Sequence, residues 1–300
     1  MKANHSRQNL FAVLAALIWG TSFVAQSVGA GYVEAFTFNA ARSAVATVFL
    51  FVLCNVLRRR RVKAGMPTQI GTRRDLLLGG LCCGTALAVS ATLQQKGLES
   101  TSSGKAGFIT ALYIVLVPIA GLLLKKRPPK AIWLSVALAV AGLYCLCITE
   151  EFSITQGDFY VMLCAFGFAI HILVIDHFTQ KVDGVELSCA QFFVVTVISS
   201  VGMLLTETPT LAGILGSMFP ILYVGIFSSG VAFTLQILAQ KDSDPTVISV
   251  LLSLESVFAV LAGAIILGDR MSGREYFGCA LVMVAVLLAQ LPDKKAVSAQ

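Results

Sequence analysis

The stretch "LLSLESVFAVLAGAIILGDR", residues 251–270, places one carboxylate, Glu255, within a long apolar run. No other charged residue lies within ten positions of it on either side. The apolar run as a whole, residues 246–267, is 22 residues long, and a helix needs about 20 residues to cross the hydrocarbon core of a bilayer. The stretch therefore indicates a membrane-spanning helix that carries an acid near its centre.

The composition of the whole chain supports the same class of protein. Hydrophobic residues make up 57% of the sequence and charged residues only 13%, whereas soluble domains carry about 25% charged residues. The apolar runs are continuous, unlike the alternating segments of outer-membrane barrels. Because only helices satisfy every backbone polar group inside one lipid-exposed segment, we expect an all-α, polytopic membrane protein.

Ten apolar runs have a length suited to spanning helices. They cover residues 10–28, 35–57, 76–93, 106–124, 131–148, 159–175, 187–205, 218–238, 246–267 and 276–291.

The basic residues between these runs predict the orientation. With a cytoplasmic N-terminus, 17 Lys and Arg side chains fall on the cytoplasmic side and four on the other, while Arg42 lies inside a span. Cytoplasmic loops of membrane proteins are enriched in Lys and Arg. We therefore expect both termini in the cytoplasm and a location in the cell inner (plasma) membrane.

The two halves of the chain resemble each other. Residues 125–146, "KKRPPKAIWLSVALAVAGLYCL", recur as residues 268–289, "GDRMSGREYFGCALVMVAVLLA". Further pairs give offsets of about 141–147 residues. Because each half has five spans, the second half must enter the membrane with opposite polarity. The pattern predicts two inverted five-helix repeats, residues 1–150 and 151–300, as in many secondary transporters.

Four motifs resemble one known family. They are "WGTSF" (19–23), "FNAARSAVA" (38–46), "GFITALYIVLVP" (107–118) and the opening stretch at 251–270. Together they resemble the EamA branch of the drug/metabolite transporter superfamily. That family often has Leu-Glu-Pro where this chain has Leu254, Glu255 and Ser256, so a proline-based kink is not expected there.

The resemblance implies a fold and a function. It implies ten helices in two inverted halves around a central cavity lined by helices one, three, four, six, eight and nine. It also implies export of small organic metabolites, such as amino acids, by alternating access. A lipid-carrier or nucleotide-sugar translocator is the alternative within transport, and a membrane-embedded enzyme is the alternative of another class.

Two charged residues inside spans are the first candidates for the site. An ionised carboxylate facing lipid at the bilayer centre costs about 2.5–3.5 kcal/mol or more, so Glu255 should face the interior. It could couple transport to protons or a cation, or form a packing hydrogen bond. Arg42 could extend outward to the interface, bind a substrate carboxylate, or pair with Glu255.

Other polar residues within the spans have two possible roles. Asn39 lies at i−3 from Arg42 on one helix face. His171 could be a satisfied donor between helices or a proton relay. Gln94 and Gln236 occupy matching places in the two halves, where they could form a pocket wall or a helix interface. Similar stripes of polar residues include Trp19 and Ser22, Thr110 and Tyr113, and Ser253; they could join helices or line the cavity.

Several other functions are not supported. The sequence lacks a Walker motif and HExxH, so we expect no enzyme activity, no cofactor and no bound metal. The basic run at residues 58–61 is interpreted as a topology determinant that contacts lipid headgroups, not nucleic acid. The expected partners are a small-molecule substrate, membrane lipids and protons as a coupling ion, with the chain a monomer or a homodimer. Pro118 predicts a kink in the fourth span.

Overall fold

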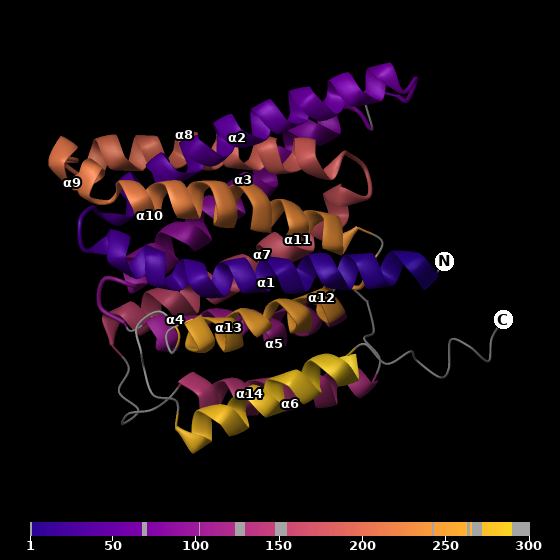
Figure 1. Ribbon diagram of the computed structural model, residues 1–300, viewed down its shortest axis with the longest axis vertical. Helices are drawn as coiled ribbons and strands as arrows, with labels where there is room; N and C mark the ends of the chain where they lie inside the picture. The colour runs from indigo at the N-terminus through magenta and orange to yellow at the C-terminus, as the bar shows by residue number, and fades with distance from the viewer. Residues whose placement is uncertain are drawn as a thin grey trace.

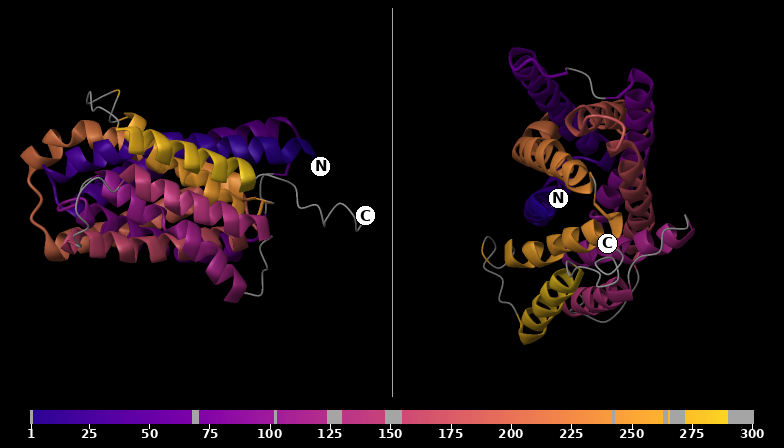
Figure 2. Two further views of the ribbon diagram at one scale, coloured as in Figure 1. Left: turned by 90° about the horizontal axis from the view of Figure 1, so that it is seen from below. Right: turned by 90° about the vertical axis from the view of Figure 1, so that its right-hand side faces the viewer.

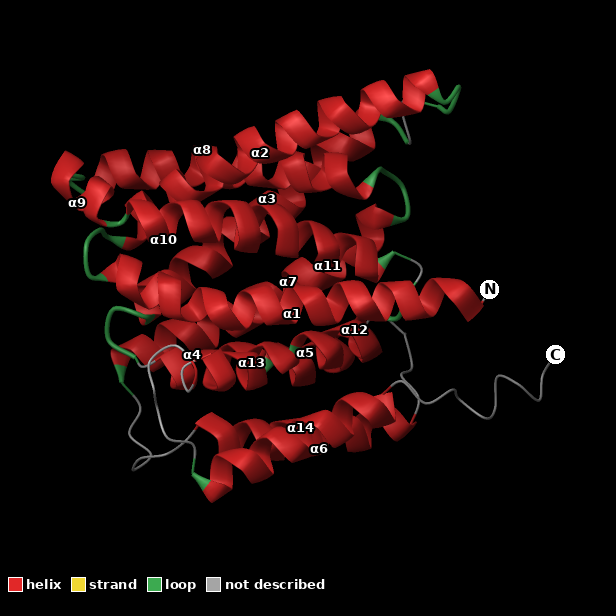
Figure 3. Cartoon of the chain, in the orientation of Figure 1, coloured by secondary structure: helices red, strands yellow, loops and turns green. Residues whose placement is uncertain are grey.

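The structure is a computed structural model that describes residues 2–67, 71–101, 103–123, 130–147, 155–241, 243–262, 265 and 272–289. The described chain is helical, and this part contains no strand (Figure 3). The prediction of an all-α protein is confirmed.

The helices follow one another along the chain with short connections. Their bounds are α1 Lys2–Ala30, α2 Ala35–Lys63, α3 Arg73–Gly97, α4 Ser103–Ala111, α5 Tyr113–Leu123, α6 Lys130–Cys147, α7 Gln156–Thr179, α8 Gly184–Thr206, α9 Leu211–Gly216, α10 Met218–Tyr223, the π-helix η1 Val224–Ala232, α11 Phe233–Gln240, α12 Pro245–Leu252, α13 Leu254–Ala262 and α14 Gly273–Ala289.

Eight helical stretches among the described residues are long and apolar enough to cross a membrane. They are Ser6–Ala30, Ala35–Lys63, Arg73–Gly97, Lys105–Leu123, Gln156–Thr179, Gly184–Thr206, Met218–Gln240 and Pro245–Ala262. The remaining two predicted spans coincide with α6, of 18 residues, and α14, of 17 residues, which are not among these eight stretches. The ends of those two spans, at residues 148 and 290–291, lie outside the described residues. The chain is thus a multi-pass membrane protein, and ten spans remains a prediction.

Helices from the first 150 residues pack mainly against helices from the second 150. In Figure 1, α2 lies beside α8, α3 contacts both α7 and α8, and α6 pairs with α14. The central helix α1 contacts α13, α11 and η1. The view along the helices in Figure 2 shows α1 between the group that contains α2 and the pair α6 and α14. The two halves of the sequence are therefore interleaved, and they meet along α1.

The exposed and buried side chains are distributed as a lipid environment requires. Large apolar side chains such as Leu204, Leu205 and Phe219 are strongly exposed on the outer faces. Polar side chains within the same helices, including Asn39 and Gln191, are buried. Polar groups in hydrocarbon are costly unless they are paired, so the polar faces of the helices turn toward one another.

Two of the spans are interrupted near the middle of the molecule, and each is divided into two shorter helices, α4 with α5 and α12 with α13. The break between α4 and α5 falls at Leu112, where the backbone N–H groups of Leu112 and Val115 bond three residues back. The helix α5 continues through Pro118, and the interruption of this span lies six residues before that proline. The kink expected at Pro118 stays a prediction. The break between α12 and α13 falls at Ser253, whose hydroxyl donates to the Val250 carbonyl at 2.7 Å. Such back-bonding competes with the helical ladder and often bends helices.

Gly20 sets the distance between α1 and α13. A Cβ at Gly20 would lie 2.6 Å from the Cβ of Phe258 and 2.7 Å from the Glu255 carbonyl oxygen. Real contacts of that kind are not found at such distances, so any side chain would force the two helices apart. The close approach holds the helix that carries Glu255 against α1.

We predict that Gly20→Ala lowers the stability of the protein in detergent. Overpacking of a tight contact costs about 1–3 kcal/mol, which exceeds the gain of about 0.5–1 kcal/mol from replacing a helical glycine by alanine. The measurement is the thermal unfolding midpoint. Gly107→Ala is the matched control, because its Cβ would meet only Ser256 Oγ, at 3.7 Å. A midpoint for Gly20→Ala equal to that of the control would contradict the predicted overpacking.

Candidate functional site

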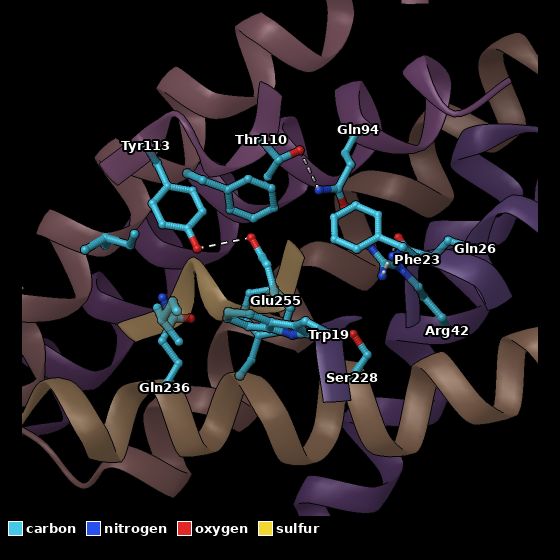
Figure 4. A pocket seen from close by; sticks show the side chains of 14 residues that line it. Trp19, Phe23, Gln26, Arg42, Gln94, Thr110, Tyr113, Ser228, Gln236 and Glu255 are labelled. Atoms are coloured by element: carbon cyan, nitrogen blue, oxygen red, sulfur yellow. Dashed lines mark hydrogen bonds between the residues drawn. The ribbon is translucent and has the colours of Figure 1, made fainter. Parts of the chain in front are cut away.

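A pocket lies between helices of the two halves of the chain, and the space within it, together with the solvent at its opening, is about 510 Å³. Figure 4 shows its lining side chains converging from helices of both halves. The lining residues are Trp19, Phe23, Gln26, Arg42, Gln94, Thr110, Tyr113, Phe168, Ile172, Ser228, Phe233, Gln236, Leu252 and Glu255.

Seven of the eleven candidate residues named from the sequence lie around this pocket. They are Trp19, Arg42, Gln94, Thr110, Tyr113, Gln236 and Glu255. The other four, Ser22, Asn39, His171 and Ser253, are buried nearby but are not part of its lining. The expected lining helices one, three, four, six, eight and nine all contribute, and the second helix adds Arg42.

Glu255 projects into the pocket from the first turn of α13. Its side chain is 4% exposed, and its Oε1 accepts a hydrogen bond of 3.1 Å from the Tyr113 hydroxyl (Figure 4). Tyr113 is the first residue of α5, and Glu255 is the second of α13. The hydrogen bond therefore joins the two interrupted spans, and in each span it lies just after the break.

Arg42 enters the pocket from α2, and its contacts are with neutral groups. Its Nε donates to Asn39 Oδ1 at 2.7 Å and its Nη1 to Gln26 Oε1 at 3.4 Å. The guanidinium also lies 5.9 Å from the centre of the Phe38 ring. The ion pairs within the described residues are Arg61–Asp183 and Lys105–Asp158, so Arg42 and Glu255 share one pocket without forming a salt bridge.

Glutamines supply much of the remaining polar surface. Gln94 donates to Thr110 Oγ1 at 3.2 Å, which ties α3 to α4. Gln95 donates to the Gln26 carbonyl at 3.1 Å, which supports the residue that contacts Arg42. Gln236, 2% exposed, lines the pocket with an Oε1 that has no hydrogen-bond partner, and the same holds for Trp19 Nε1. Neither atom is satisfied by a protein group among the described residues.

The four candidate residues outside the lining form hydrogen bonds within their own helix or with a neighbouring helix. The hydroxyl of Ser22 donates to the Ile18 carbonyl of its own helix at 2.7 Å, and the hydroxyl of Ser253, just after α12, donates to the Val250 carbonyl at the same distance. His171 Nε2 contacts Gln191 Oε1 at 3.0 Å, between α7 and α8. Asn39 receives the Arg42 hydrogen bond and donates to Thr92 Oγ1 at 3.3 Å. Asn39 therefore orients a lining residue without lining the pocket itself.

The aromatic wall of the pocket was largely missed by the sequence reasoning. Trp19 packs edge-on against Phe233, with ring centres 4.8 Å apart, and Phe23 and Phe168 complete the wall. Phenylalanine is ordinary in a membrane span, so nothing in the local sequence distinguishes these rings from lipid-facing ones. Gln26 was detectable, because it lies at i+7 from Trp19 on the same helix face.

The described residues contain no group of three or more His, Cys, Asp or Glu side chains that could hold a metal ion. The pocket combines one cation, one carboxyl group, neutral amides and aromatic rings.

The comparisons with known proteins agree with one another and indicate a family of transporters. The sequence model of the EamA-like transporter family matches residues 7–148 and, separately, residues 155–291. Two proteins of Archaeoglobus fulgidus, each described as an uncharacterized transporter, are similar over most of their length. One is 29% identical over 284 residues, covering 94% of this chain and 85% of its own. The other is 24% identical over 291 residues, covering 94% and 98%.

A solved crystal structure has the same fold. It superposes with a TM-score of 0.76 at 18% identity, covering 95% of this chain and 97% of its own. At that identity the likeness bears on the fold alone.

We predict that Tyr113→Phe destabilises the protein by about 1–3 kcal/mol, because it leaves a buried carboxyl group without its hydrogen-bond donor. The measurement is the free energy or midpoint of unfolding in detergent. Tyr144→Phe is the matched control, since Tyr144 is 46% exposed and surface changes usually stay within about 0.5 kcal/mol. Equal stability of the two variants would show that the Tyr113–Glu255 hydrogen bond contributes nothing to folding.

Proposed function

The chain belongs to the EamA-like transporter family and is a multi-pass membrane transporter, and we propose that it exports small organic metabolites, such as amino acids, by alternating access. The cargo would bind in the pocket between the two halves. The observation that carries the proposal is this pocket, because most of its lining residues are buried and they come from both halves of the chain.

The proposed architecture is two inverted repeats of five helices, residues 1–150 and 151–300. Support comes from the family model, which matches each half separately, and from the recurring sequence motifs. The helical breaks at Leu112 and Ser253 fall at matching places in the two halves, in agreement with the offset of the sequence repeat. In transporters with inverted repeats, the substrate site lies near the bilayer midplane between the repeats.

The proposed orientation follows from the basic residues in the loops. The C-terminal end of α2 carries Arg58, Arg59, Arg60 and Arg61, and such runs stay on the cytoplasmic side. We place the protein in the inner membrane with both termini in the cytoplasm. The direction is proposed from the motifs. They resemble those of the EamA family, and that resemblance implies export of metabolites.

Glu255 is the proposed coupling group. It is a carboxyl group at membrane depth, buried, and in contact with the pocket. A group of this type can exchange a proton with whichever side the pocket faces, so a proton gradient could drive the cycle. If Glu255 does not couple, the substrate gradient alone supplies the driving force.

Counterflow in proteoliposomes tests transport independently of direction and coupling. Vesicles loaded with unlabelled amino acids should accumulate the labelled amino acid from a panel only when the protein is present. An imposed pH gradient should then drive net movement of the same compound. If no amino acid of the panel exchanges, the proposed cargo is wrong.

We predict that Glu255→Gln keeps counterflow but loses the movement driven by the pH gradient, because exchange needs binding and not proton release. Glu34→Gln is the matched control, since Glu34 is exposed and caps no backbone group with its side chain. If the Glu255 variant keeps its full pH dependence, Glu255 is not the coupling acid.

A further inference from the structure

Arg42 is a buried cation whose recorded contacts are all neutral. It is 5% exposed, and its hydrogen bonds engage two of the five guanidinium N–H groups, through Asn39 and Gln26. The bond to Gln26 is long, at 3.4 Å. A cation at this depth is costly unless it faces a cavity or a counter-charge. Arg42 lines the pocket, so an anion bound there could supply its counter-charge.

The guanidinium is held in a defined orientation. Asn39 accepts from Nε and is itself bound to Thr92, while the ring of Phe38 lies beside the charge. These contacts occupy the Nε side of the planar group and leave donors at its outer end. In Figure 4, Arg42 lies beside Gln26 and Gln94 at one side of the pocket, and Glu255 lies near the middle, between Arg42 and Tyr113.

The charges of the pocket select among anions. Arg42 is the only Lys or Arg among the described lining residues, and a carboxyl group shares the same space. A phosphate or diphosphate would bring two or more negative charges to a single cation. A carboxylate brings one, and its planar oxygens match the guanidinium fork.

The rest of the pocket indicates the body of the ligand. Trp19, Phe23 and Phe233 form an apolar wall on which a hydrocarbon or ring could pack. We propose that Arg42 is an anion-binding subsite that takes the carboxylate of a small monocarboxylate with an apolar or aromatic body. This inference rests on the proposed function of the pocket as the cargo site.

The test uses the full-length protein in detergent and the fluorescence of Trp19. The chain has two tryptophans, Trp19 and Trp133, so the Trp133→Phe background leaves Trp19 as the reporter within the pocket. Three matched probes share a phenyl ring: 3-phenylpropionate has only the carboxylate, phenethylamine has only the amine, and phenylalanine has both. The two carboxylates should change the emission of Trp19 saturably, and phenethylamine should bind at least tenfold more weakly than 3-phenylpropionate.

Arg42→Gln should weaken 3-phenylpropionate by roughly 30-fold or more, the loss typical of removing one partner of a buried charge pair. Its affinity for phenethylamine should change little. Arg42→Lys keeps a point charge but not the fork, so it should bind the carboxylate about tenfold more weakly than wild type. It serves as the second variant should Arg42→Gln fail to fold. Arg59→Gln, an exposed arginine on the same helix, is the matched control and should bind as wild type does.

The inference is overturned if Arg42→Gln binds 3-phenylpropionate within threefold of wild type. It is also overturned if Arg42→Lys binds it with wild-type affinity, or if phenethylamine binds as well as the acid. Tighter binding of phenylalanine than of 3-phenylpropionate would support the subsite and place the ammonium group near Glu255.

The separate counterflow assay distinguishes the two proposals. If the carboxylates bind but do not exchange, transport of these acids is contradicted and the subsite stands. If exchange is unaffected by Arg42→Gln, the subsite alone is contradicted.

Discussion

The constraint on which this structure depends is the absence of water in the hydrocarbon core of a membrane. Every backbone polar group must then be satisfied within its own helix, and every polar side chain must find a partner or a cavity. The distribution of side chains follows from this: Leu204, Leu205 and Phe219 face outward, while Arg42 and Glu255 face inward. The polar residues thus determine which face of each helix turns toward its neighbours, and the pocket forms where those faces meet.

The course of the chain was largely predictable because this constraint acts on length and composition. Apolar runs of membrane length predicted the helices, and eight of them meet the requirements for a span. The interruptions at Leu112 and Ser253 and the π-helix Val224–Ala232 were not predictable in this way. They depend on local hydrogen bonds, such as Ser253 to Val250, which leave the apolar pattern unchanged.

The residues of the candidate site were predictable where their side chains are polar, because a polar side chain is costly in hydrocarbon. A charged or amide side chain in an apolar run must face the interior, and this reasoning named four residues that line the pocket, Arg42, Gln94, Gln236 and Glu255. The stripes of polar residues named three more, Trp19, Thr110 and Tyr113. The sequence could not say which interior surface each one faces, because that depends on the rotation of the helix. His171 faces Gln191 between α7 and α8, whereas Gln236 faces the pocket. Phe23, Phe168 and Phe233 gave no signal, since an aromatic ring is equally at home against lipid and against a ligand.

Arg42 and Glu255 share one pocket and yet do not form an ion pair. A direct pair would neutralise both groups and leave little free energy for a ligand to gain, since each charge would already have its counter-charge. Here Tyr113 holds the carboxyl group, while Asn39 and Gln26 hold the guanidinium. These neutral partners satisfy part of the hydrogen-bonding capacity of each group, and they leave the charge of the guanidinium without a counter-charge. On the proposal that the pocket is the cargo site, a ligand that carries a matching charge stabilises the occupied state over the empty one, and this difference is the free energy available to change the conformation of a transporter.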